Sequence, residues 1–286
     1  MKSYLILAVG LLMTLSGITI VEASPTLDQI KKTETIRIGY RKSEPPMSFL
    51  DENNQPVGYS IDLCNQIAKA VKSKLKNPNI AIKYVPVTAT TRFEAIENNT
   101  IDILCGSTTK TLSRAEKVDF TQLSFVTGAS LLSLEESKIG TIADLKGKKV
   151  AAGKNTTTIE NLKKALKKGN IEATIVPIDT ADAGMEALMK GEVDAFSGDQ
   201  IVLIGLALTN KSDKKFAIAK EIFSYEPFAL AVKRNDADFR LLADRVLSEL
   251  NRSGAISLIY SKWFGGYTKE VPNLLEAMFL LNSTPE

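Results

Sequence analysis

Short runs of β-branched residues alternate with helical patterns along most of this chain. Strands are predicted over residues 35–40, 80–87, 101–105, 149–152, 174–178 and 193–196. Helices are predicted over residues 61–75, 93–98, 157–166 and 181–190, followed by a segment over 236–263 that is broken near Ser253 and Gly254. Alternation of this kind is typical of parallel sheets covered by helices, so we expect an α/β fold.

One helix–turn–strand pattern occurs twice with the same spacing, in residues 94–107 and 186–199. In both copies the distance from a Glu to an Asp is eight residues, a Gly follows four residues after that Asp, and a polar residue comes next. Any βαβ unit can produce such a pattern, but two similar lobes would also explain it. Because ligands of open α/β sheets bind beyond the carboxyl ends of strands, two lobes would bring Ser107 and Asp199 to a shared cleft from opposite sides.

The first 23 residues have the three-part layout of a secretory signal peptide. A basic start at Lys2 precedes an apolar stretch over residues 5–20, and small residues lead to Ala23. A membrane anchor is the alternative, but the apolar stretch is shorter than the roughly 20 residues that span a bilayer. We therefore predict removal of residues 1–23 and a periplasmic mature chain.

The chain contains no histidine. This excludes Ser-His-Asp and Cys-His catalysis and every metal site that needs a histidine ligand, and we predict no cofactor and no metal. The formal net charge of +3 is too mild to indicate binding to nucleic acid or to an anionic membrane.

The two cysteines are Cys64 and Cys105. A secreted chain permits a disulfide. Because Cys64 lies in a helical pattern and Cys105 in a strand pattern, we favour two buried thiols over a bridge.

Polar residues that suit an α-amino acid follow several predicted strands. A guanidinium such as that of Arg114 can bind a carboxylate with two parallel hydrogen bonds. Hydroxyls in residues 107–109, and in 156–158 at the start of a helix, can add donors, and Asp199 can bind an ammonium. Each residue also has an ordinary explanation, since hydroxyls often cap helices and most arginines are solvated. Together they favour a binding site.

At these residues the chain resembles the family-3 periplasmic solute-binding proteins, which bind polar amino acids for ABC importers. The similar segments are residues 45–49, 57–63, 101–121 and 144–158. The resemblance implies an α/β, two-lobed, type II periplasmic-binding-protein fold in which two crossover strands form a hinge. It also implies a monomer without cofactor, whose partners are an amino acid and a membrane ABC permease.

The resemblance also implies the division of the chain and the roles of residues. Lobe 1 is expected over residues 33–126 plus 228–270, lobe 2 over 127–227, and a C-terminal tail over 271–286. This tail packs across the lobes or trails loosely. By matching position, Arg114 is expected to hold the ligand α-carboxylate with help from Thr109 and Thr157. Ser107 and Asp199 are expected to hold the ammonium.

Within the family, the chain is similar to glutamate/aspartate-binding proteins. That similarity implies that Arg41 and Arg92 hold a side-chain carboxylate, although Arg92 has a structural salt bridge as its alternative role. Two departures weaken this pocket: the family's lobe-2 histidine is missing, and Ala89 stands where a hydroxyl residue is expected. Glutamine or another polar amino acid is therefore the alternative ligand.

Two other function classes are open at this point. An enzyme similar to the periplasmic cyclohexadienyl dehydratases would need a general acid in the cleft, for which Glu44 and Asp182 are candidates. Asp199 is better explained as an ammonium partner. A receptor's sensing domain is disfavoured because no segment after residue 23 is apolar enough to span a membrane.

Overall fold

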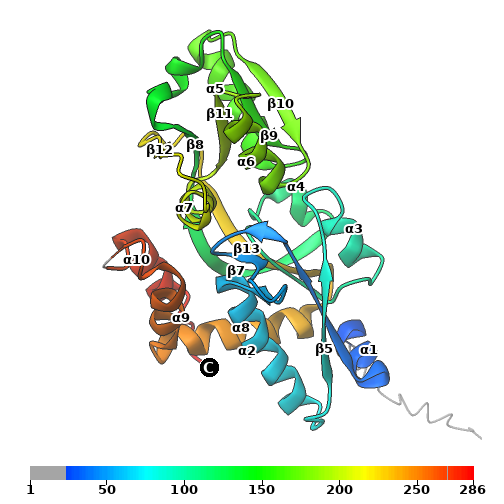
Figure 1. Ribbon diagram of the computed structural model, residues 1–286. Coiled ribbons are helices and arrows are strands. Elements are labelled where there is room, and N and C mark those ends of the chain that lie inside the picture. Colours follow the sequence, from blue (N-terminus) through cyan, green and yellow to red (C-terminus); the bar gives the residue numbers. More distant parts are fainter. Residues whose placement is uncertain (1–23, 269) are drawn as a thin grey trace, which may run out of the picture.

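The computed structural model of the protein describes residues 24–268 and 270–286. The predicted signal peptide, residues 1–23, lies outside the described residues. Figure 1 shows two groups of elements, one above the other, joined by extended strands in the middle of the molecule. Each group is built around a five-stranded sheet.

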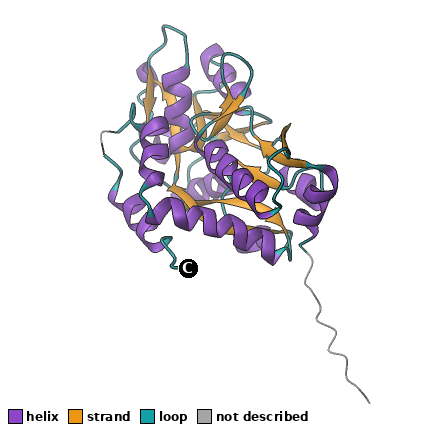
Figure 2. Ribbon diagram, turned by 90° about the horizontal axis from the view of Figure 1, so that it is seen from below, coloured by secondary structure: helices purple, strands orange, loops and turns teal. Residues whose placement is uncertain are grey.

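The lower sheet has the strand order β5-β1-β6-β13-β7. Its strands are β1 (Thr35–Tyr40), β5 (Ala81–Pro86), β6 (Ile103–Cys105), β7 (Val118–Thr127) and β13 (Glu226–Lys233). The helices of this part are α1 (Pro25–Thr33), α2 (Tyr59–Lys74), α3 (Arg92–Glu97), α4 (Leu112–Ala115) and α8 (Ala237–Arg252). Figure 2, seen from below, shows helices lying across the strands. Helix α2 forms because Leu63, Ile67 and Val71 repeat every four residues and are fully buried along one face.

The upper sheet has the order β10-β9-β11-β8-β12. Its strands are β8 (Ala129–Leu134), β9 (Lys149–Gly153), β10 (Thr174–Ile178), β11 (Ala195–Asp199) and β12 (Phe216–Ile218). Its helices are α5 (Thr157–Gly169), α6 (Ala181–Lys190) and α7 (Gln200–Thr209), with 3₁₀ turns η1 (Glu135–Ser137) and η2 (Ile142–Leu145). A third, three-stranded sheet is formed by β2 (Ser43–Glu44), β3 (Ser48–Leu50) and β4 (Pro56–Val57).

Both large sheets are mixed, so the prediction of parallel sheets is wrong in this respect. β1, β5 and β6 are parallel, as are β9, β10 and β11. However, β13 is antiparallel to β6 and β7, and β8 is antiparallel to β11 and β12. The reason is that the chain leaves the lower sheet along β7 and returns to it along β13, in the opposite direction. The α/β, two-sheet architecture itself is confirmed.

The chain passes between the sheets at two neighbouring places. Only Gly128 separates β7 from β8, and Glu226 at the start of β13 pairs with Thr127 at the end of β7. A Cβ on Gly128 would lie 2.1 Å from Ile222 Cγ2 and 2.4 Å from the carbonyl oxygen of Ser224. Glycine is therefore required where the two crossings touch. The residue limits given above for the two lobes stay a prediction.

The chain ends in two helices, α9 (Ala255–Phe264) and α10 (Asn273–Leu281). Helix α10 lies within the predicted C-terminal tail and buries Leu275, Met278 and Phe279. It packs against β7 and α8 of the lower part, which contradicts a loose tail. Among the residues that the structure describes, no helix is long and apolar enough to cross a bilayer.

Cys64 of α2 and Cys105 of β6 form a disulfide, with their Cα atoms 6.4 Å apart. The preference for two free thiols is therefore wrong. Both residues are fully buried, and α2 packs directly on β6. The helix and strand patterns placed each cysteine correctly, but the distance between them depends on how the helix packs.

We predict that removing the disulfide lowers the free energy of unfolding by about 4 kcal/mol, because the bridge closes a loop of 41 residues in the unfolded chain. The measurement is urea unfolding of a Cys64→Ala/Cys105→Ala variant against the oxidised protein. Adding a reductant to the wild type should reproduce the loss, whereas the variant should not respond to it. Equal midpoints for all samples would contradict the prediction.

Candidate functional site

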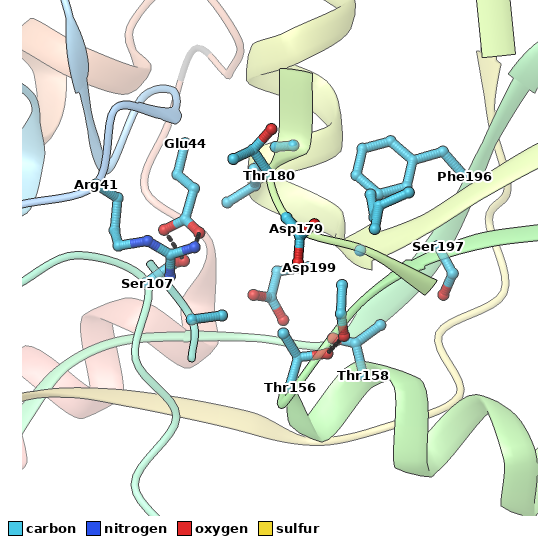
Figure 3. A pocket seen from close by; sticks show the side chains of 16 residues that line it. Arg41, Glu44, Ser107, Thr156, Thr158, Asp179, Thr180, Phe196, Ser197 and Asp199 are labelled. Carbon is cyan, nitrogen blue, oxygen red and sulfur yellow. Dashed lines mark hydrogen bonds and ion pairs between the residues drawn. The ribbon is translucent and has the colours of Figure 1, made fainter. Parts of the chain in front are cut away.

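A small cavity of about 60 Å³ lies between the carboxyl ends of strands from both large sheets. From the lower sheet, Arg41 follows β1 and Ser107 lies two residues beyond β6. From the upper sheet, Asp179 follows β10 and Asp199 ends β11. In Figure 3 the labelled side chains of the two sheets face one another across this space. The position agrees with the general rule that ligands of α/β sheets bind beyond the carboxyl ends of strands.

On the lower side of the cavity, Arg41, Glu44 and Ser107 form a connected cluster. The Nη2 atom of Arg41 lies 2.8 Å from Oε1 of Glu44, and both side chains are nearly buried. The Ser107 hydroxyl donates to the other oxygen of Glu44, Oε2, at 2.6 Å. Figure 3 shows this cluster facing the polar side chains of the upper sheet. The guanidinium of Arg41 therefore already has a carboxylate partner.

On the upper side, Asp199 has an unsatisfied oxygen. Its Oδ1 atom is shielded from solvent and has no hydrogen-bond partner among the described residues. Burial, together with the neighbouring carboxylates of Glu226 and Glu44, raises the pKa of Asp199 well above its usual range. The positive charges of Arg114 and Arg41 oppose this shift but do not outweigh it, and within the described residues no cation forms an ion pair with this carboxylate. A bound ammonium would do so.

Arg92 is placed close to the cavity but does not line it. The residue is 3% exposed, and its guanidinium donates to the carbonyl oxygens of Ala89 and Asn155. It also lies 4.6 Å from the ring centroid of Phe93. Burial lowers the pKa of Arg92, and the positive charges of Arg114 and Arg41 add to this effect. Because Asn155 belongs to the upper part of the molecule, Arg92 forms a bridge between the two parts.

The predicted carboxylate clamp forms a second group beside the cavity. Arg114 donates from Nη1 to the carbonyl oxygen of Thr109 at 2.7 Å. The hydroxyls of Thr109 and Thr157 lie 3.2 Å apart, across the two parts of the molecule. These three residues line an adjacent groove, and they share it with Glu226. Burial lowers the pKa of Arg114, while Glu226 and Asp199 oppose the shift.

Glu226 is the hydrogen-bond centre of this second group. Its carboxylate is fully buried, and it accepts from Thr109 and Thr157 at Oε2, each at 2.6 Å. Ser224 donates to Oε1 at 2.6 Å and Asn161 at 3.1 Å. Within the described residues no basic side chain forms an ion pair with Glu226, so these four donors stabilise its charge instead.

The structure therefore divides the predicted residues between two adjacent spaces. Arg41, Ser107 and Asp199 line the cavity. Arg114, Thr109 and Thr157 line the groove beside it, and Arg92 lies buried near both. The two departures noted in the sequence lie at the cavity as well, because it is lined by Ala89 and by residues 179–181, the segment in which the resemblance implies the missing histidine.

Two carboxylates of the site were missed as binding-site residues. Glu44 is a candidate acid for catalysis in the sequence, and its ion pair with Arg41 has no sequence signal, because a spacing of three residues brings side chains together only on a helix and these two residues lie between and in β-strands. Glu226 carries no local signal, because its four donors come from residues 2 to 117 positions away in the sequence. Only the folded chain brings these donors together.

Comparison with known proteins gives a consistent result. The family model described as bacterial extracellular solute-binding proteins, family 3, matches residues 36–266. A glutamate/aspartate import solute-binding protein of Salmonella typhimurium is 33% identical over 242 residues, which cover 85% of this chain and 80% of that protein. An L-glutamate/L-aspartate-binding protein of Pseudomonas aeruginosa is 33% identical over 252 residues, covering 88% and 82%.

Solved structures agree with this family assignment. The structure of an ancestral arginine-binding protein bound to glutamine superposes with a TM-score of 0.72 at 28% identity, covering 81% of this chain and 98% of that chain. This match extends over nearly the whole of that protein.

We predict that Glu226→Ala lowers the free energy of unfolding by about 3 kcal/mol, because four buried or half-buried donors lose their acceptor. Urea unfolding measures this loss. Glu172→Ala removes an exposed carboxylate and serves as the matched control. Equal stabilities of the two variants would show that the four hydrogen bonds contribute nothing to folding.

Proposed function

Because this chain belongs to the bacterial extracellular solute-binding proteins, family 3, we propose that it captures a small polar amino acid and delivers it to an ABC importer. In this role it works in the periplasm as a monomer, and its partners are the amino acid and a membrane permease. Family membership makes the chain a solute-binding protein rather than an enzyme, so the dehydratase alternative is set aside.

The observation that carries this proposal is the uncompensated carboxylate of Asp199 in the cavity between the two sheets. A buried carboxylate without a donor is costly, and a ligand ammonium supplies both a charge and three donors. Ser107 lines the same cavity and can contribute its hydroxyl oxygen as an acceptor. We therefore assign the ligand ammonium to Asp199 and Ser107.

The α-carboxylate of the ligand is assigned to Arg114. Within the described chain its guanidinium makes one hydrogen bond, to the carbonyl oxygen of Thr109, and a planar guanidinium can donate several more. Thr109 and Thr157 were expected to assist, but their hydroxyl protons are directed to Glu226. In our proposal these two residues position the clamp, while Arg114 and the N-terminal end of α5 stabilise the carboxylate.

The side chain of the ligand extends toward Arg41. Glutamate and aspartate are the first candidates, since relatives named for these ligands are 33% identical to the chain. The amides glutamine and asparagine have the same shape and are the alternative.

Binding is proposed to occur by closure of two lobes, residues 33–126 plus 228–270 and residues 127–227, about the paired crossings. Contacts between the two parts support this mechanism. The Asn155 side chain donates to Thr90 at 2.9 Å, and Gly205 of α7 is so close to Pro45 that a Cβ would lie 2.1 Å from its carbonyl oxygen. A ligand that contacts both lobes would favour this closed arrangement, which the permease would recognise.

The test is calorimetric titration of the purified protein after unfolding and refolding to remove carried-over ligand. We expect one-to-one binding of at least one polar L-amino acid, with a dissociation constant of about 1 μM or lower. All twenty amino acids are titrated under the same conditions. The absence of binding to every one of them would refute the proposed function.

We also predict that Asp199→Asn weakens binding of every bound amino acid by about 100-fold, because the ligand ammonium loses its charged partner. The loss should be equal for ligands with different side chains, since the ammonium is common to all of them. Asp213→Asn, an exposed change of the same type, is the control. A loss that depends on the ligand side chain would remove Asp199 from the ammonium site.

A further inference from the structure

We propose that Glu44 decides the ligand class, and that the Arg41–Glu44 pair selects a side-chain amide over a side-chain carboxylate. The ligand in this reading is glutamine or asparagine. The inference rests on the proposed function, because it concerns the side-chain end of the same site.

The pair is part of the cavity wall and is tightly held. Both oxygens of Glu44 are engaged, one by Arg41 at 2.8 Å and the other by Ser107 at 2.6 Å. The backbone N–H of Arg41 donates to the buried hydroxyl of Ser48 at 2.9 Å. A Cβ on Gly106 would lie 2.9 Å from Arg41 Cγ, so the absence of a side chain there makes room for the pair. The arrangement is therefore fixed by packing on several sides.

The charges around the cavity do not favour a further carboxylate. Among the described residues that line it, Arg41 is the only basic one, and it is accompanied by Glu44, Asp179 and Asp199. Asp179 is balanced by Lys154 at 3.0 Å. Arg92, the second expected partner of an acidic side chain, does not line this cavity, and both of its Nη atoms donate to backbone carbonyls. A ligand carboxylate would thus approach an arginine whose charge is already neutralised by Glu44.

Both polar groups of a side-chain amide, its carbonyl and its NH₂, can form a hydrogen bond with the Arg41–Glu44 pair. Its carbonyl oxygen can accept from an N–H of Arg41 that is not used by Glu44, since a guanidinium has five donors. Its NH₂ group can donate to a remaining lone pair of a Glu44 oxygen. A carboxylate offers no donor to Glu44 and places two like charges side by side, which disfavours binding. Sites built to pair with a donor reject analogues that lack it.

The experiment compares L-glutamine with L-glutamate, and L-asparagine with L-aspartate, by calorimetry near neutral pH. The refolded wild type and Glu44→Gln are titrated under identical conditions. Glu97→Gln makes the same chemical change at an exposed position of α3 and is the matched control. Thermal unfolding of each protein shows whether the variants are folded.

We expect the wild type to bind the amide at least about tenfold more tightly than the matching acid. In Glu44→Gln the ratio of amide affinity to acid affinity should fall by at least about tenfold, because Arg41 loses its counter-charge and residue 44 gains a donor. Glu97→Gln should keep the wild-type ratio.

Other results would overturn the inference. If the wild type binds glutamate or aspartate more tightly than the matching amide, the inference is refuted, even if Glu44→Gln does not fold. The inference is also refuted if a folded Glu44→Gln has the same ratio of amide affinity to acid affinity as the wild type. Both results would leave the proposed function intact, whereas failure to bind any amino acid would refute that function instead. Binding of L-arginine or L-lysine alone would show that Glu44 selects a cation and would likewise reject the amide.

Discussion

The antiparallel pairing of β7 with β13 is the constraint on which the site depends. It carries the chain from one sheet to the other and back at adjacent places, and so directs the carboxyl ends of strands from both sheets toward one space. Gly128 permits the close contact of the two crossings, and Glu226 begins the returning strand. The Glu226 carboxylate, which accepts hydrogen bonds from both parts of the molecule, therefore lies where the chain crosses between them.

Three buried or half-buried carboxylates in this region are stabilised in different ways. Glu226 has four hydrogen-bond donors and no ion pair among the described residues. Glu44 has one cation and one hydroxyl. Asp199 retains an oxygen that has no hydrogen-bond partner in residues 24–268 and 270–286. Because burying an uncompensated charge is unfavourable, the first two belong to a preorganised frame and the third is the one that a ligand can satisfy.

Much of the fold follows from local patterns. The repeated helix–turn–strand unit has the same hydrogen bonds in both copies, since Asp102 accepts from the backbone of Arg37 and Asp194 from that of Lys149. The turns need a left-handed residue, which Asn99 and Gly191 provide. The antiparallel strands β8 and β13 were not predicted, because their long apolar runs do not show which neighbour they pair with or in which direction.

The sequence by itself determined the α/β class, the approximate limits of six of the thirteen strands and six of the ten α-helices in the described part of the chain, and the polar residues at strand ends, because these depend on periodicity and on turn chemistry within a few residues. Only the tertiary structure decided the mixed sheets, the disulfide of Cys64 and Cys105, and the neutralisation of Arg41 by Glu44. A disulfide or a neutralised charge requires atoms within a few ångströms of each other. The packing of α2 on β6 sets the first distance, and the turn from β1 into the β2–β3 pair sets the second.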